Sequence, residues 1–368
     1  MSSCTLRIPA LGLSVMLAAC SGSSNDSPAD AGSTTLDGSH QGAPATGAPS
    51  SHDASGLTST TRGDAMAGSP PAMAGDPVDV SSLLGTAERG QYLVDHVLMC
   101  GVCHTPSLDN GEPDMTRYLA GSRSYDFKDS DDAGTIVTVN AENLTSHDPE
   151  GLHSWTNEQI RTAITKGIDD EKVAIYPIMP YQNYALLKPE DVDSIIRYLR
   201  TVPPNDNVVP ADYPYSDQHP PVPPVDDTKV PHTTLAPTDP AFAAAERGRY
   251  LAKTACLYCH TEELSAGVPN LEKAFGGGKK YTFVRLKPEQ TSTNLTPHAT
   301  GLATWSIDDI ATAIKTNQEK GTGRTFCNTH PGGTERLGMM TDADRTDIAT
   351  YLHTLPPVAN GPFQCLKQ

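Results

Sequence analysis

The pattern Cys-x-x-Cys-His occurs twice in this chain, once from Cys100 to His104 and again from Cys256 to His260. Each copy places two thiols and an imidazole within five residues. If these side chains bind a metal or a cofactor, the fold must form around that group. Three kinds of chemistry use cysteines at this spacing: a thioredoxin-like redox pair, a zinc site and the covalent attachment of a c-type haem. The surrounding sequence decides among them.

The context of the two motifs favours haem attachment. A thioredoxin-like pair needs a βαβ setting, which the neighbouring sequence lacks, and a zinc site more often pairs its motifs within one small domain. A c-type haem takes two thiols for its two vinyl groups and the adjacent histidine for its iron. We therefore predict two covalently bound haem c groups, with thioether links to Cys100, Cys103, Cys256 and Cys259 and with His104 and His260 as proximal iron ligands.

The two motifs belong to an internal repeat. The matching segments are 88–106 with 246–261, 143–167 with 294–316, and 188–204 with 341–357. The offset between the copies is nearly constant, at 156 positions from Cys100 to Cys256 and 150 from Trp155 to Trp305. A nearly fixed offset over three separate segments indicates two copies of one domain.

Each copy is predicted to be mostly α, with three main helices. The first leads into the cysteine motif. The second begins at an N-cap with a capping partner three residues later, as in Thr156 with Gln159 and Ser306 with Asp309. The last has apolar residues at the i, i+3, i+4, i+7 spacing of one buried face. These residues are Val192, Ile195, Ile196 and Leu199 in the first copy, and Ile348, Tyr351, Leu352 and Leu355 in the second.

These features resemble the class I cytochrome c domain, and more closely the multi-haem cytochrome c subunits of bacterial membrane alcohol and gluconate dehydrogenases. The resemblance covers roughly residues 88–204 and 246–357, including the Asn-Leu-Thr segments that begin at Asn143 and Asn294. It implies that these loops lie against the haem propionates. Two tryptophans also match the family, although simple core packing is an equal alternative for them: Trp155 and Trp305.

In this family the sixth iron ligand is usually a methionine from the loop before the last helix. Met179-Pro180 matches that position, twelve residues before Asp191. A buried loop methionine can also be core filling. The resemblance implies a first haem with His104 and Met179 as its ligands, a pairing that raises the reduction potential.

The second copy differs at this position, because an offset of 151 carries Met179-Pro180 onto His330-Pro331. If histidine replaces methionine, the second iron is held by His260 and His330, which favours the ferric state and lowers its potential below that of the first. Three alternatives for the sixth position stay open: His330, one of the two methionines Met339 and Met340 that directly precede the last helix, or a vacant site.

Two further cysteines, Cys327 and Cys365, bracket the last helix of the second copy. In an exported protein a disulfide between them is the expected use. The competing interpretation is a free thiol at Cys327 that binds iron. His147 and His298 recur in the Asn-Leu-Thr segments, but these loops lie on the propionate side in the family, which argues against a distal-ligand role.

The N-terminus is predicted to be a lipoprotein signal. Residues 1–20 carry one positive charge, Arg7, and an apolar run too short to span a bilayer. The run ends in Leu-Ala-Ala-Cys20, which resembles a bacterial lipobox, so Cys20 is the expected lipidation site; an ordinary signal peptide is the alternative. Residues 21–80 contain almost no large apolar residue and are expected to be a disordered tether. Ser21 after the cysteine resembles an outer-membrane sorting signal.

The remaining chain divides into a first cytochrome c domain at 81–205, a proline-rich linker at 206–240 and a second cytochrome c domain at 241–368. We expect the linker to be semi-rigid and to run over the surface. Lys and Arg number 27 against 44 Asp and Glu, a formal charge of −17. So acidic a chain repels nucleic acid and is suited to a basic redox partner or simply to solubility.

Electron transfer is the function that the sequence favours. Both irons are expected to be six-coordinate and no other catalytic constellation is present, so the chain is predicted not to be an enzyme itself. As a membrane-anchored lipoprotein facing the periplasm or the cell surface, it would accept electrons from a periplasmic dehydrogenase or another donor. It would pass them to another cytochrome or a terminal acceptor. The alternative is a di-haem cytochrome c peroxidase-like enzyme, in which one iron would have to lose its distal ligand.

Overall fold

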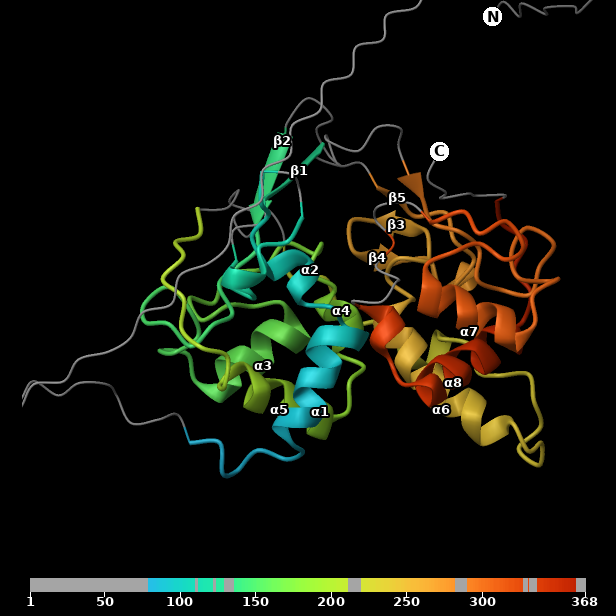
Figure 1. The fold of residues 1–368 in the computed structure, drawn as a ribbon, viewed down its shortest axis with the longest axis horizontal. Coiled ribbons are helices and arrows are strands. Elements are labelled where there is room, and N and C mark those ends of the chain that lie inside the picture. The colour runs from blue at the N-terminus through green and yellow to red at the C-terminus, as the bar shows by residue number, and fades with distance from the viewer. Residues whose placement is uncertain are drawn as a thin grey trace, which may run out of the picture. The chain divides into compact units, whose positions relative to one another are not determined.

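The computed structural model describes residues 79–109, 112–121, 124–128, 136–210, 220–281, 290–326, 330 and 336–361. The predicted lipidation site Cys20, nearly all of the tether, and both partners of the predicted disulfide, Cys327 and Cys365, lie outside these residues. Within the described residues the helices form two sets, coloured blue to green and yellow to red in Figure 1. None of the helices in these ranges is long and apolar enough to cross a membrane.

The first half, residues 79–210, contains helices and one antiparallel hairpin. Its helices are α1 (Ala87–Tyr92), the π-helix η1 (Leu93–Val97), α2 (Gly101–His104), the short 3-10 helix η2 (Met115–Arg117), α3 (Asn157–Lys166), α4 (Tyr181–Tyr184) and α5 (Pro189–Leu199). The hairpin is formed by β1 (Ser124–Lys128) and β2 (Ile136–Asn140), with Ser124 opposite Asn140.

The second half, residues 220–361, repeats the order of the main helices. These are α6 (Phe242–Ala255), α7 (Ile307–Thr316) and α8 (Asp342–His353), with the 3-10 helices η4 (Asp227–Lys229), η5 (Leu271–Lys273) and η6 (Leu337–Met339) between them. Two small antiparallel pairs complete it, β3 (Glu263–Ser265) with β4 (Val268–Pro269), and β5 (Lys280–Tyr281) with β6 (Gln290–Thr291).

The predicted local signals for the helices are confirmed. Thr156 and Ser306 are N-caps, and each forms a full capping box with the residue three positions later. The predicted apolar faces of α5 and α8 are buried, with relative exposures between 0 and 4%. Together with residues of η1 and α6 they line the hydrophobic core.

In each half the first and last helices cross at a glycine. A Cβ atom added to Gly90 in α1 would lie 1.9 Å from the carbonyl oxygen of Ser194 in α5. One added to Gly248 in α6 would lie 1.9 Å from the carbonyl oxygen of Asp347 in α8. Both glycines come from the repeated Glu-Arg-Gly segment, so the repeat preserves the residue without a side chain where two backbones touch.

The two halves differ where the first helix reaches the cysteine motif. Cys100 stands twelve positions after Glu88, whereas Cys256 stands ten after Glu246. In the second half α6 stays α-helical up to Ala255. In the first half α1 widens into the π-helix η1, and Met99 adopts a positive φ of 55°. A π-helical turn accommodates extra residues without ending the helix, so the two additional residues explain this difference.

Two expectations need correction. The chain is less completely α than predicted, because the hairpin β1–β2 packs Val137 and Val139 against Tyr125 in a small separate core. The alternation in Ile136–Asn140 was the available signal. The second part of the 206–240 linker does not run over the surface, because Val225 and Val230 are 6% and 0% exposed.

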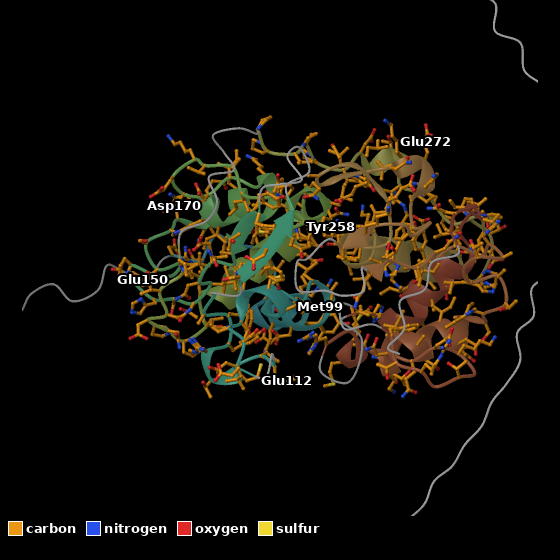
Figure 2. All side chains as sticks on the ribbon, turned by 90° about the horizontal axis from the view of Figure 1, so that it is seen from above. Met99, Glu112, Glu150, Asp170, Tyr258 and Glu272 are labelled. Atoms are coloured by element: carbon orange, nitrogen blue, oxygen red, sulfur yellow. The ribbon has the colours of Figure 1, made fainter. Side chains whose placement is uncertain are left out.

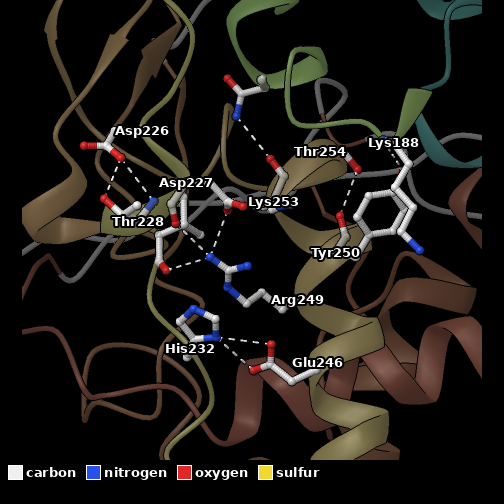
Figure 3. Close-up of polar contacts among 12 residues, drawn as sticks. Lys188, Asp226, Asp227, Thr228, His232, Glu246, Arg249, Tyr250, Lys253 and Thr254 are labelled. Carbon is white, nitrogen blue, oxygen red and sulfur yellow. Dashed lines mark hydrogen bonds and ion pairs between the residues drawn. The ribbon is translucent and has the colours of Figure 1, made fainter. Parts of the chain in front are cut away.

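The buried part of the linker is held by charged residues of α6 (Figure 3). Arg249 donates to the carbonyl oxygens of Val230 and Pro231 at 3.0 and 3.2 Å and to the Asp227 carboxylate at 2.8 Å. Lys253 Nζ lies 2.8 Å from the other carboxylate oxygen of Asp227. Both cations are almost fully buried, so they need these partners, and the linker becomes part of the second half.

Candidate functional site

The two cysteine motifs adopt the same turn. In the first half, Cys100 precedes α2, and the His104 backbone N–H donates to the Cys100 carbonyl oxygen at 2.9 Å. In the second half, the His260 N–H donates to the Cys256 carbonyl oxygen, also at 2.9 Å. One helical turn therefore brings the first thiol, the second thiol and the imidazole of each motif together.

The motif histidines His104 and His260 are oriented in the same way by the backbone. His104 Nδ1 lies 2.7 Å from the Glu142 carbonyl oxygen, and His260 Nδ1 lies 2.8 Å from that of Thr293. A carbonyl oxygen can only accept, so Nδ1 carries the hydrogen and Nε2 is left as the basic nitrogen. Burial lowers the pKa of both rings, which keeps them neutral. Metal-binding histidines have this arrangement, so both residues suit an iron at Nε2.

The motif thiols do not look like a redox pair. None of the four forms a disulfide with another described residue. Burial raises the pKa of Cys100 and of Cys256 to about 12, whereas reactive redox cysteines have lowered pKa values. Within the described ranges, no three or more His, Cys, Asp or Glu side chains converge on a common point as in a structural zinc site. The raised pKa values of Cys100 and Cys256 therefore argue against a thiolate-based redox pair.

Two site residues were missed by the sequence analysis. Thr105 and Thr261 directly follow the motif histidines and are fully buried. The Thr105 hydroxyl accepts from the Leu119 N–H at 3.2 Å, and that of Thr261 accepts from the Phe275 N–H at 3.1 Å. They fasten the end of each motif to the next loop. The repeated triplet Cys-His-Thr was the signal that could have found them.

The second half places His330 beside the motif histidine His260. The ring centroids of His260 and His330 are 6.4 Å apart, with 76° between the ring planes. Two imidazoles bound to one metal through bonds of about 2 Å would have centroids about 6 Å apart, so the gap fits one metal ion. His330 Nδ1 lies 2.6 Å from Asn317 Oδ1, which accepts its hydrogen, and the Phe326 ring lies 5.0 Å away. Burial and the nearby His260 lower the pKa of His330 to about 3.

The two rival methionines occupy other environments. Met339 is 55% exposed, while Met340 is 2% exposed and belongs to the hydrophobic core. The His330 ring, by contrast, lies 6.4 Å from the His260 ring, measured between their centroids.

Met179 lies in the turn before α4. Its backbone N–H donates to the Tyr176 carbonyl oxygen at 3.2 Å, and the side chain is partly exposed. At the other end of α4, the Tyr184 hydroxyl lies 3.4 Å from the Leu98 carbonyl oxygen, two residues before Cys100. Through α4, the loop that carries Met179 is therefore connected to the segment that enters the first motif.

The Asn-Leu-Thr asparagines are saturated by hydrogen bonds within the chain. Asn143 Nδ2 donates to the Asn205 carbonyl oxygen at 2.8 Å, and Asn294 Nδ2 donates to that of Val358 at 2.9 Å. Each Oδ1 accepts from the N–H and hydroxyl of the threonine two residues later. These asparagines therefore tie their loops to the segment after the last helix, and their contact with haem stays a prediction. The two tryptophans Trp155 and Trp305 are partly buried and pack against the hydrophobic core.

Comparison with known proteins agrees with this geometry. Residues 245–356 match the family model for cytochrome c. The chain is 28% identical over 303 residues to the diheme cytochrome c-type of Cereibacter sphaeroides, covering 77% of this chain and 90% of that protein. It is 27% identical over 305 residues to the fructose dehydrogenase cytochrome subunit of Gluconobacter japonicus, covering 78% of this chain. It is 28% identical over 292 residues to the gluconate 2-dehydrogenase cytochrome c subunit of Pantoea cypripedii, covering 73% of this chain.

The matches span 56% and 59% of the two dehydrogenase subunits, so they leave much of those proteins uncovered. These relatives are cytochrome subunits and not catalytic subunits, which confirms the prediction that this chain is not itself an enzyme. Residues 245–356 therefore form a cytochrome c domain, a family that carries covalently bound haem c, and the chain is similar to a diheme cytochrome and to cytochrome subunits of dehydrogenases.

Proposed function

We propose that the chain transfers electrons through two covalently attached haem c groups, one on each Cys-x-x-Cys-His motif. The observation that carries this proposal is the repeated histidine geometry. In His104 and in His260, Nδ1 donates to a backbone carbonyl oxygen, which leaves Nε2 for the iron. Each haem would supply a one-electron ferric/ferrous couple. The chain supplies the thioether-forming cysteines, the oriented imidazoles and a buried setting, on two tandem cytochrome c domains.

The two sites are unequal in this proposal. His104 and Met179 hold the first iron, and His260 and His330 hold the second. An imidazole in place of a thioether stabilises ferric iron, so the second haem has the lower potential. Electrons therefore pass from the second haem to the first. The 6.4 Å separation of His260 and His330, and the bond from His330 to Asn317, support the second ligand pair.

The partners are other redox proteins. The cytochrome subunits of dehydrogenases among the relatives support a dehydrogenase as donor and a further cytochrome or terminal acceptor as recipient. We propose that a lipid on Cys20 anchors the exported protein to a membrane, facing the periplasm or the cell surface, with residues 21–80 as the tether. The formal charge of −17 suits a basic partner and disfavours nucleic acid.

The ligand assignment is tested by the near-infrared methionine–iron charge-transfer band. The ferric wild type should contain two haems per chain and one equivalent of this band. His330→Ala should keep the band and convert the second haem to a high-spin or water-ligated form. Met339→Leu is the matched control and should change neither. Two band equivalents in the wild type, or a second haem lost in Met339→Leu, would contradict the assignment.

A further inference from the structure

The loop that carries Met179 is held in part by the other half of the protein. The segment 177–184 contains the end of that loop and α4, and three side-chain hydrogen bonds connect it to the second half. They are Tyr258 Oη to the Pro177 carbonyl oxygen (3.1 Å), Gln182 Nε2 to the Gly267 carbonyl oxygen (3.1 Å) and Asn183 Nδ2 to the Lys253 carbonyl oxygen (3.2 Å). Gln182 and Asn183 are fully buried, so these bonds are shielded from water.

Tyr258 is unusual because it stands inside the second cysteine motif, between Cys256 and Cys259. Its counterpart in the first motif is Val102, which has no hydroxyl. Figure 2 shows Tyr258 where the green and brown parts of the chain adjoin. One residue of the second haem-attachment turn therefore reaches the backbone two residues before Met179.

The ring of Tyr258 is fixed by a buried cation. Lys279 Nζ lies 3.2 Å from the centroid of the ring, in a cation–π contact. Lys279 is 6% exposed, and its Nζ is 2.8 Å from Glu263 Oε1. Because a buried ammonium needs a partner, Glu263 holds Lys279 and Lys279 holds the ring. The hydroxyl is thus presented to Pro177 from a rigid support.

Gly267 makes a second contact with the same loop. Gly267, in the turn between β3 and β4, has a φ of +72°, and an added Cβ would lie 2.6 Å from Cβ of Pro177. The Gly267 N–H in turn donates to Glu263 Oε1 at 3.1 Å. Glu263 therefore supports both the β3–β4 turn, directly, and Tyr258, through Lys279. Both the turn and Tyr258 contact Pro177.

The sixth-ligand candidate of the second half is held differently. His330 is fixed from within its own half, by Asn317 Oδ1 at 2.6 Å and by the Phe326 ring. The hydrogen bond from Tyr258 to the Met179 loop crosses between the halves, whereas the contacts of His330 with Asn317 and Phe326 lie within the second half.

We propose that Tyr258 is a positioning residue for the first haem site, and that through the Pro177 carbonyl it controls how firmly Met179 stays on the first iron. This inference rests on the proposed function, which makes Met179 the sixth ligand. The turn that attaches the second haem thereby stabilises the ligation of the first. A partner that displaced the β3–β4 turn would loosen Met179 without touching the first half.

The test uses the full chain with both haems attached. Tyr258→Phe removes only the hydroxyl, and ferric protein is titrated with imidazole while the methionine–iron band is followed. Imidazole binds the first iron only when Met179 is off, so its apparent affinity reports the stability of the closed loop. Loss of one hydrogen bond should tighten imidazole binding about two- to tenfold.

Tyr250→Phe is the matched control, because its hydroxyl also bridges the two halves but bonds to Asp191 and to the Lys188 N–H, away from the loop. It should leave imidazole affinity within about twofold. Gly267→Ala lies outside the attachment motif and should act in the same direction as Tyr258→Phe, which covers the case in which that variant fails to attach its second haem. Unchanged affinity in both Tyr258→Phe and Gly267→Ala, or an equal change in Tyr250→Phe, overturns the inference. A wild type without the methionine band overturns the ligand assignment instead.

Discussion

Replacing Tyr250 by phenylalanine should destabilise the protein more than the same change at Tyr92, although the two residues occupy equivalent positions in the repeat. Each hydroxyl reaches the N-terminus of the last helix in the other half. The bonds are Tyr92 Oη to Asp344 Oδ2 (2.5 Å), the Thr341 N–H to Tyr92 Oη (3.1 Å), Tyr250 Oη to Asp191 Oδ2 (2.6 Å), and the Lys188 N–H to Tyr250 Oη (3.1 Å). The contact is therefore reciprocal, as in a two-fold interface.

The magnitudes differ because the acceptors differ in burial. Asp191 is 5% exposed, whereas Asp344 is partly exposed to solvent. Hydrogen bonds to charged groups contribute about 1.5–3 kcal/mol when shielded, and ordinary ones about 1 kcal/mol. Tyr250→Phe should therefore lower the free energy of unfolding by about 2 kcal/mol, and Tyr92→Phe by about 1 kcal/mol. Burial, followed by the bond to Asp344, raises the pKa of Tyr92 to about 12, so the donor stays protonated at neutral pH.

The assay is denaturant unfolding of proteins with equal haem content, followed by circular dichroism and haem absorbance. Tyr351→Phe is the within-half control, because its hydroxyl donates to the Pro231 carbonyl oxygen at 2.6 Å in the same half. The two interface changes should separate the unfolding of the halves, and the control should not. Equal losses at Tyr92 and Tyr250, or a larger loss at Tyr92, would refute the burial argument.

Three further changes test other parts of the structure. Gly248→Ala should cost more than about 3 kcal/mol of stability, measured by thermal unfolding, because its Cβ would collide with the backbone of α8. Burial alone would raise the pKa of Asp191, but hydrogen bonds including that from Arg89 hold it below 3.8. The stability from this group is therefore present above about pH 4 and is lost as pH falls through the lowered pKa, so Asp191→Asn should flatten that acid limb in pH-dependent unfolding. Asn317→Gly keeps the left-handed backbone but removes the acceptor from His330, so the second haem should show a higher potential in a redox titration.

Much of the local structure was predictable because it depends on neighbouring residues. The capping boxes that begin at Thr156 and Ser306 need only residues within one turn. The buried faces of α5 and α8 follow from apolar spacing alone. The Cys-x-x-Cys-His motifs likewise predict haem attachment from five adjacent residues. The cytochrome c match over 245–356 agrees with that prediction.

The remaining features depend on residues far apart in the sequence. In the sequence, nothing distinguishes three tyrosines from ordinary core or surface residues: Tyr92, Tyr250 and Tyr258. Their roles appear only where the two halves pack against each other. The sequence shows that the spacing before Cys100 is longer than that before Cys256. It does not show that a π-helix accommodates the extra residues. Val230 lies in a proline-rich segment that predicts a surface linker, but its carbonyl oxygen accepts from the buried Arg249, which helps to explain why it is internal.

In the proposed function, two covalent haems with different sixth ligands form a directed electron-transfer pair. A potentiometric titration of the full chain, followed in the visible and near-infrared regions, tests this most directly. It should show two one-electron steps, with the methionine–iron band disappearing on reduction in the higher-potential step alone. A single haem, or a methionine band that follows the lower-potential step, would show that the two haems do not form such a pair.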